Sequence, residues 1–211
     1  MGVYAIGDIH GCYESLVNLL DKIQPASDDI LIFLGDYIDR GPYSSEVVDF
    51  LITLSKLTNC IFLRGNHEDM MLNFLRTRDP FYYQIWERNG SKATVSSYGG
   101  IDNIPDHHLN FFENTKYYFV YENYAFVHGG VVPGVPLERQ KKEDLLWIRY
   151  EFINSSHNLP YIVVFGHTPF EEPFVGEDKI GIDTGCVYGG KLTAYNLTEQ
   201  TFLSASCKKY W

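Results

Sequence analysis

The segment Gly65–Leu75 reads GNHEDMMLNFL and closely follows the apolar run Cys60–Leu63. The apolar run predicts a buried strand, and the segment after it predicts a helix. The polar residues between strand and helix are called a polar corner below. The start of a helix explains part of this corner, because Asn66 is suited to cap the first turn and Glu68 would favour the positive end of the helix dipole. Asn66 and His67 are also side chains that bind metals. The polar corner is therefore a candidate for part of a metal site.

The same pattern recurs along the chain. Each time, a short apolar run rich in β-branched or aromatic residues stops at a glycine or at a residue able to bind a metal. The segments are VYAIGDIHG ending at Gly11, ILIFLGDYIDRG at Gly41, CIFLRGNHE at Glu68, YAFVHGG at Gly130, YIVVFGHTP at Pro169 and KIGIDTG at Gly185. Such runs predict buried strands followed by tight loops, and ligands bind at that edge of open α/β sheets. The polar residues are therefore expected to meet.

Length and charge limit the class of protein. The chain has 211 residues, of which 45% are hydrophobic, which is enough for one domain with a substantial core. Its formal net charge of -10 argues against nucleic acid as a partner, since that binding relies on clustered Lys and Arg. A buried group of cations would offset several of the carboxylates.

The cysteines and the N-terminus predict a cytoplasmic protein. The four cysteines (Cys12, Cys60, Cys186 and Cys207) lie far apart without a CxxC spacing, so reduced, packed thiols are expected. The N-terminal sequence MGVYAIGDIHG lacks the features of a signal peptide. No apolar run approaches the roughly 20 residues that span a bilayer, so no membrane partner is expected.

The spacing of the corners predicts the fold. Asp8, Asp36 and Asn66 follow one another at intervals of about 30 residues, the length of a βαβ unit, with helical periodicity between them. Aromatic-rich pieces at about 70–112 predict a helical insertion over the site. The later runs YYFVYENYAFV, YIVVFG, KIGID, KLTAYNL and TFLSAS predict a second, more antiparallel sheet. We therefore predict one α/β domain over residues 1–211, a sandwich of two mixed β-sheets flanked by helices.

Side chains in these corners form a metal-ligand set of oxygen and nitrogen atoms without thiolates. The set comprises Asp8, His10, Asp36, Asn66, His128 and His167. It suits manganese, iron or zinc. There are too many ligands for one tetrahedral zinc, whereas two ions bridged by one carboxylate use them naturally, as in phosphate-ester hydrolases. A single His beside a glycine is usually structural, but the clustering of His and carboxylates in these corners indicates a site.

The motifs occur in a characteristic order. GDxHG stands at Gly7–Gly11, GDxxDRG at Gly35–Gly41 and GNHE at Gly65–Glu68, followed by VHGG from Val127, GHTP from Gly166 and IDTGCVYGGKLTAY from Ile182. In these motifs the sequence resembles the phosphoprotein phosphatase family of metallophosphoesterases, in particular its compact bacterial and phage-type serine/threonine protein phosphatases. The resemblance covers nearly the whole chain and implies the calcineurin-like metallophosphoesterase fold.

The resemblance also implies roles at the metal centre. The first metal would be bound by Asp8, His10 and Asp36, and the second by Asp36, Asn66, His128 and His167. Asp36 would bridge the two ions. His67 would be the acid that protonates the leaving oxygen, with Asp39 as its partner. The chemistry supports this role independently, because a positioned proton donor accelerates such a step by roughly 10²- to 10⁴-fold.

Two arginines are expected to bind the phosphate. Arg40 matches the first such arginine of the family, and Arg149 in LLWIRYEF is the candidate for the second, with Arg139 as the alternative. Planar guanidinium groups bind phosphate oxygens bidentately. Tyr188 in the CVYGG segment would line the substrate.

The leading prediction is a metal-dependent phosphomonoesterase. It would dephosphorylate phosphoserine and phosphothreonine, with phosphotyrosine as a further candidate, in protein or peptide substrates. A hydroxide bridging two divalent ions, with Mn²⁺ preferred over Fe or Zn, would attack phosphorus in line. A monomer is expected.

Two alternatives remain open. One is a symmetrical dinucleotide polyphosphate (diadenosine tetraphosphate) hydrolase of the same family. Such members typically replace the acid's carboxylate partner and often read GNHD, whereas this chain has Asp39 and Glu68. The other is a non-catalytic metal-binding scaffold, which would need neither His67 nor Arg40.

Overall fold

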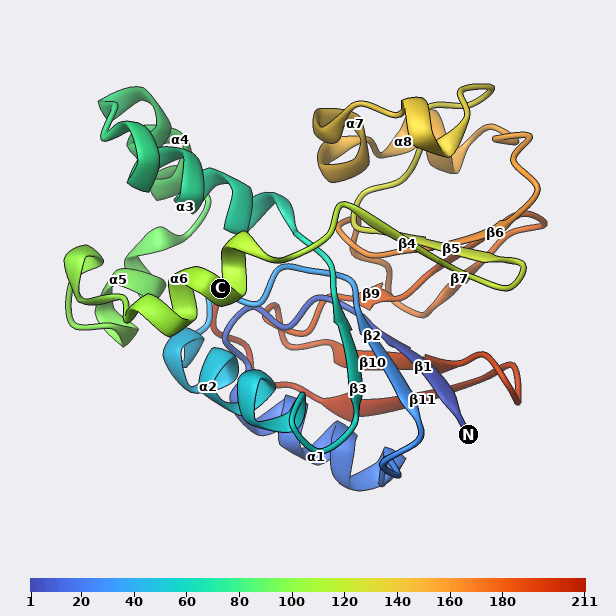
Figure 1. Ribbon diagram of the computed structural model, residues 1–211, viewed down its shortest axis with the longest axis horizontal. Coiled ribbons are helices and arrows are strands. Elements are labelled where there is room, and N and C mark those ends of the chain that lie inside the picture. Colours follow the sequence, from blue (N-terminus) through green and yellow to red (C-terminus); the bar gives the residue numbers. More distant parts are fainter.

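In the computed structural model, which describes residues 1–211, two mixed β-sheets form a sandwich (Figure 1). The first sheet has the order β11-β10-β1-β2-β3, with β9 paired to β10. Its strands are β1 (Val3–Ile6), β2 (Ile30–Phe33), β3 (Asn59–Phe62), β9 (Asp183–Thr184), β10 (Lys191–Asn196) and β11 (Thr201–Ser206). β1, β2 and β3 are parallel, as the βαβ spacing predicted, and β10 is antiparallel to β1.

The second sheet has the order β4-β5-β6-β8-β7. Its strands are β4 (Tyr118–Tyr121), β5 (Tyr124–Val127), β6 (Ile162–Phe165), β7 (Phe174–Val175) and β8 (Lys179–Gly181). β5, β6 and β8 are parallel to one another, and the outer pairs are antiparallel. The predicted sandwich of two mixed sheets is therefore confirmed.

The composition of the second sheet differs from the prediction. The runs KLTAYNL and TFLSAS, assigned to it from the sequence, form β10 and β11 of the first sheet. β10 pairs with the open edge of β1, where Ala5 lies opposite Tyr195 on one side and Ile32 on the other. An alternating run fixes which face of a strand is buried, but it does not fix which sheet edge the strand joins.

Helices cover the outer faces of the sheets and form one lateral group (Figure 1). The helices are α1 (Tyr13–Ile23), α2 (Ser44–Leu54), α3 (Asn66–Thr77), α4 (Pro80–Arg88), α5 (Ser91–Ser97), α6 (Asp106–Glu113), α7 (Lys142–Trp147) and α8 (Tyr150–Ile153), with 3₁₀ turns η1 (Ile101–Asn103) and η2 (Leu137–Arg139). α1 and α2 lie on the first sheet, and α7 and α8 lie beside the second. α3 to α6 form the lateral group, where the sequence predicted helical pieces.

The strands alternate between two cores. In β1, Val3 and Ala5 face the second sheet and Ile6 faces α1 and its neighbours; in β2, Ile32 and Phe33 divide in the same way. This is the period-two pattern of a strand buried on both faces. A third cluster packs between the second sheet and α7 and α8. Both faces being filled, polar side chains collect at the ends of the strands.

The expectation of reduced cysteines was wrong for one pair. Cys186 and Cys207 form a disulfide, whereas Cys12 and Cys60 are free. The chain after β11 returns beside the loop that follows β9, where Tyr210 donates its backbone N–H to the Val187 carbonyl at 2.9 Å. A sequence separation of 21 residues gives no hint of this return. No helix in the structure combines the length and the apolar composition that crossing a membrane requires.

Candidate metal centre

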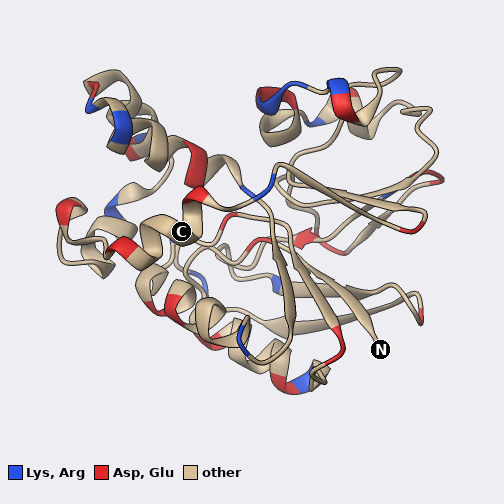
Figure 2. Cartoon of the chain, in the orientation of Figure 1, with Lys and Arg blue, Asp and Glu red and all other residues tan.

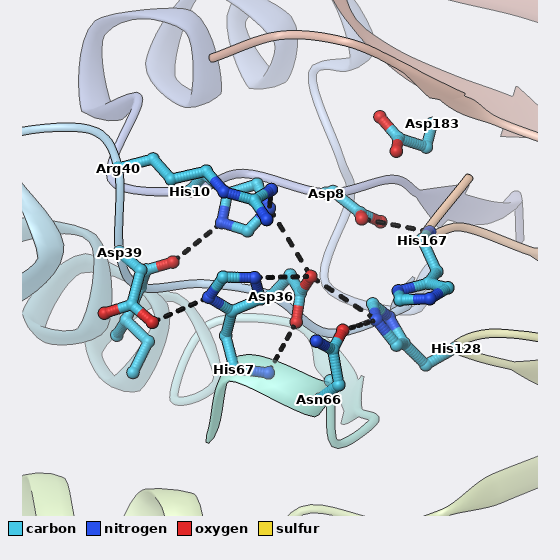
Figure 3. Close-up of polar contacts among 12 residues, drawn as sticks. Asp8, His10, Asp36, Asp39, Arg40, Asn66, His67, His128, His167 and Asp183 are labelled. Atoms are coloured by element: carbon cyan, nitrogen blue, oxygen red, sulfur yellow. Dashed lines mark hydrogen bonds and ion pairs between the residues drawn. The ribbon is translucent and has the colours of Figure 1, made fainter. Parts of the chain in front are cut away.

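The predicted ligands come together where five strands end. Asp8 and His10 follow β1, Asp36 follows β2, Asn66 follows β3, His128 follows β5 and His167 follows β6. All of them are buried. The ends of these strands in the two sheets face one another, so all six predicted ligands lie together (Figure 3).

Asp36 lies at the centre of this group. Its Oδ2 is 3.4 Å from Nε2 of His10 and 3.4 Å from Nε2 of His128. The Oδ1 atom of Asn66 is in turn 2.8 Å from Nε2 of His128. On the other side, Oδ2 of Asp8 accepts the backbone N–H of His167 at 3.0 Å. One carboxylate therefore faces ligands from both of the predicted metal sites (Figure 3).

Backbone carbonyls orient two of the imidazoles. Nδ1 of His10 is 2.8 Å from the Ile38 carbonyl, and Nδ1 of His128 is 3.0 Å from the Leu34 carbonyl. A carbonyl accepts only, so Nδ1 of each ring carries a proton. Nε2 of His10 is then left as a lone pair, whereas Asp36 raises the pKa of the buried His128 to about 9 and its Nε2 faces Asp36 and Asn66 as a donor. This is the support that metal-binding histidines usually have.

The two predicted phosphate-binding arginines each contact Nε2 of a histidine in this group, one at His10 and the other at His167. Nη1 of Arg40 lies 2.8 Å from Nε2 of His10, and Nε of Arg149 donates to Nε2 of His167 at 3.0 Å. Burial, with the nearby cations, holds the pKa of both imidazoles well below its usual range, so both are neutral ligands. Each guanidinium group therefore places a positive charge beside Nε2 of a predicted metal ligand. Arg139, the alternative, lies in η2.

Buried carboxylates also fit cations. Oδ1 of Asp8 is buried without any hydrogen-bond partner, and burial together with Asp183 raises the pKa of Asp8 well above its usual range. Burial likewise raises the pKa of Asp183 to about 6. Although burial alone would raise the pKa of Asp36, His128 and His67 hold it well below the usual range. A buried carboxylate oxygen without a partner, beside several imidazole nitrogens, is what a divalent cation would satisfy.

Close backbone packing holds the ligands in place. His10, Asp36, Asp39, Arg40 and His167 all have positive φ angles, between 47° and 72°. Such conformations are unfavourable for residues with side chains and gather at functional sites. A Cβ on Gly65 would lie 2.0 Å from Oδ1 of Asp36, so only glycine fits before the GNHE helix.

Glu68 connects the GNHE segment to the neighbouring loop. Its buried carboxylate accepts the backbone N–H groups of Gly65, Asp36 and Tyr37, each at 2.9 Å. It therefore ties the start of α3 to the loop after β2. Asn66 does not cap the helix as expected, because Gly65 is the N-cap and the Asn66 side chain faces His128.

His67 and Asp39 form a buried pair at the edge of the ligand group. Nδ1 of His67 lies 2.6 Å from Oδ2 of Asp39, and Nε2 of His67 lies 3.9 Å from Oδ2 of Asp36. Burial raises the pKa of Asp39 to about 8 and lowers that of His67 to about 3. Both shifts favour an uncharged imidazole beside an uncharged carboxyl group over an ion pair, with one proton in the hydrogen bond between Nδ1 and Oδ2.

The lateral helices complete this pair with residues that the sequence analysis missed. Trp86 of α4 donates its indole N–H to Oδ2 of Asp39 at 2.8 Å, and the Thr94 hydroxyl of α5 donates to Oδ1 at 2.5 Å. No local pattern around Trp86 or Thr94 indicates this contact. Asp183, by contrast, ends the KIGI run in the same manner as the predicted ligands. The strand-end pattern was sufficient to find it.

Two half-exposed aromatic side chains flank the site. Tyr188, predicted to line the substrate, is 39% exposed, and its ring centroid lies 5.6 Å from Cζ of Arg40. Trp147, which the sequence analysis left without a role, is 41% exposed and packs edge-on against the His167 ring with centroids 5.8 Å apart. An aromatic surface is thus available beside each of the two arginine and histidine pairs.

Comparison with known proteins agrees with this geometry. The family model described as calcineurin-like phosphoesterase matches residues 1–189. The chain belongs to this family. It is 29% identical to the Oceanobacillus iheyensis protein named bis(5'-nucleosyl)-tetraphosphatase PrpE (asymmetrical), over 99% of this chain and 94% of that protein. It is 27% identical to the Bacillus subtilis protein of the same name, over 92% and 90%.

Solved structures share the fold. One described as a candidate diadenosine tetraphosphatase superposes with a TM-score of 0.77 at 24% identity, covering 98% of this chain and 94% of that one. A cold-active protein-tyrosine phosphatase from a Shewanella species has a TM-score of 0.68 at 17% identity, covering 97% and 80%. A family of metal-dependent phosphoesterases implies divalent ions, and the Asp and His groups around Asp36 are candidates to hold them.

Proposed function

We propose that this protein is a metal-dependent hydrolase of dinucleoside polyphosphates that cleaves a tetraphosphate asymmetrically. The observation that carries the proposal is the ligand group around Asp36 with an arginine on either side of it. The curated relatives match this chain over nearly their whole length and are named asymmetrical tetraphosphatases. Their names favour a dinucleotide substrate over the phosphoprotein substrate predicted from the sequence. They also favour asymmetrical over symmetrical cleavage.

In this proposal, Asp8, His10, Asp36, Asn66, His128 and His167 hold two divalent ions. When bound, the ions would supply Lewis-acid activation of the phosphoryl group and of the attacking water. Manganese is the preferred candidate for a set of oxygen and nitrogen ligands, with iron and zinc as others. Side chains of the protein bind the phosphate and the nucleobases.

Arg40 and Arg149 bind the non-bridging phosphate oxygens and spread the charge that develops on them. Each swings from its histidine partner toward the phosphate. Trp147 and Tyr188 offer aromatic faces against which nucleobases stack, an interaction worth about 1–3 kcal/mol per base. Both residues are partly exposed, Trp147 at 41% and Tyr188 at 39%.

A second candidate is hydrolysis of phosphoserine and phosphothreonine in proteins. The observation in its favour is the His67–Asp39 pair, since an alkoxide leaving group needs a proton far more than a nucleotide phosphate does. In this candidate His67 protonates the departing oxygen and Asp39 holds the imidazole in position.

The test is a product analysis with manganese added. Diadenosine tetraphosphate should give AMP and ATP, whereas two ADP would indicate symmetrical cleavage. Phosphoserine, phosphothreonine and phosphotyrosine peptides should be cleaved with a much lower kcat/KM. Trp147→Leu should raise KM for the dinucleotide and leave KM for p-nitrophenyl phosphate unchanged, with Phe81→Leu on the exposed start of α4 as a control. Preference for the peptides would replace the proposal by the second candidate.

A further inference from the structure

A second group of metal-binding side chains lies away from the candidate centre, where α6 packs on α2. It consists of Asp49 from α2 and the adjacent His107 and His108 from α6. Figure 1 shows the two helices beside each other, and Figure 2 shows acidic positions along α2. None of these residues belongs to the predicted site, and the reaction proposed for the centre does not use them.

The ligand atoms already have the separations of a metal site. Oδ1 of Asp49 lies 2.8 Å from Nε2 of His108 and 3.5 Å from Nε2 of His107. All three ligand atoms lie within 4.8 Å of one another. In a tetrahedral zinc site with bonds of about 2.0–2.1 Å, ligand atoms are roughly 3.3 Å apart. The two separations from Asp49 lie within about 0.5 Å of this value, and the two imidazole nitrogens lie within 4.8 Å of each other.

One ligand is held rigidly by a further hydrogen bond. The Tyr98 hydroxyl lies 2.8 Å from Nδ1 of His108, which is 1% exposed. A fixed partner on Nδ1 directs Nε2 toward the position of the ion, as at most metal-binding histidines. The side chains of His107 and Asp49 are 60% and 64% exposed, so an ion can enter from solvent and keep a water as its fourth ligand.

We propose that Asp49, His107 and His108 bind one zinc ion that links α6 to α2. Two imidazoles and one carboxylate favour zinc over magnesium or calcium, which prefer oxygen ligands only. Because the ligands come from two helices, the ion stabilises the packing of the lateral helices on the first sheet. The proposal is independent of the reaction at the candidate centre.

The test compares zinc binding by the wild-type protein and His107→Ala. The candidate centre also takes up zinc, so the informative quantity is the difference between the two proteins, measured by elemental analysis after equilibrium dialysis against zinc. His107→Ala should bind one ion fewer per chain. Asp106→Asn, an acidic residue in the first turn of α6 outside the group, should match the wild type.

Further readouts separate zinc binding from misfolding and from catalysis. Asp49→Asn should lose the same ion. This variant preserves the size of the side chain, so a loss of zinc in it cannot come from altered packing. Zinc should raise the Tm of the wild type by more than that of either variant. Manganese-supported hydrolysis of p-nitrophenyl phosphate should be unchanged in His107→Ala. Equal zinc content and equal affinity in the wild type, His107→Ala and Asp49→Asn would overturn the proposal.

Discussion

The indole N–H of Trp86 donates to Oδ2 of Asp39 at 2.8 Å, the same oxygen that lies 2.6 Å from Nδ1 of His67. Helix α4 thus contacts the carboxylate that positions His67, while Thr94 of α5 donates to the other oxygen. All of these groups are buried, so no water competes for the hydrogen bonds. The lateral helices therefore support the proposed acid as well as lying beside the site.

Trp86→Phe should lower kcat for phosphoserine about tenfold, with little change in KM. The substitution keeps an aromatic ring in the core and removes the N–H that orients Asp39, a buried hydrogen bond worth up to about 1.5 kcal/mol. Phe is smaller than the fully buried Trp86, so the variant should also lose stability. Tyr83→Phe, which removes a hydroxyl from the same helix, is the control and should behave as the wild type. A kcat for Trp86→Phe equal to that of the control would show that the contact does not support catalysis.

His67→Asn should slow hydrolysis of phosphoserine far more than hydrolysis of p-nitrophenyl phosphate. The nitrophenolate leaving group is much less basic and hardly needs a proton, whereas an alkoxide does. The loss should fall on kcat rather than on KM, and metal content should barely change. Equal rate losses on both substrates in a fully metallated variant would leave His67 as a positioning group only.

Asp36→Asn should weaken binding of both divalent ions. The Asp36 carboxylate faces His10 on one side and His128 on the other, at 3.4 Å each. By contrast, His167→Asn should affect only one of the two ions. Calorimetric titration with manganese measures both constants, and removal of the ions by a chelator should abolish hydrolysis. Two sites of wild-type affinity in Asp36→Asn would contradict the bridging role.

Cys207→Ser should lower both the stability and the affinity for substrate. Loss of the disulfide to Cys186 releases a loop of about 21 residues, which lowers the free energy of unfolding by about 3 kcal/mol. The disulfide also anchors the C-terminal residues after Cys207, where Lys209 forms a backbone bridge with Tyr188, so the loop that carries Tyr188 should loosen and KM should rise. A thiol reductant should produce the same changes in the wild type. A wild-type Tm that is insensitive to reductant would exclude this contribution.

The sequence by itself determined the strands and the polar side chains that gather at the candidate centre. Each apolar run formed a strand, and the polar residues that follow it, such as GNHE at Gly65–Glu68, lie at the strand's end, although β3 itself is only partly buried. Parallel strands bring those ends to one edge of the sheet, so Asp8, Asp36 and Asn66 meet as a consequence of local pattern. Asp183, which follows the run KIGI and was not among the predicted ligands, obeys the same rule.

Only the tertiary structure decided the contacts made between distant segments. The pairing of β10 with β1, the disulfide of Cys186 with Cys207, and the approach of Trp86 to Asp39 all depend on where the chain returns. Local propensity and periodicity determine which face of an element is buried. They do not determine its neighbour, because backbone hydrogen bonds and apolar surfaces are alike from one edge or face to the next. The neighbour is selected by the packing of the complete chain.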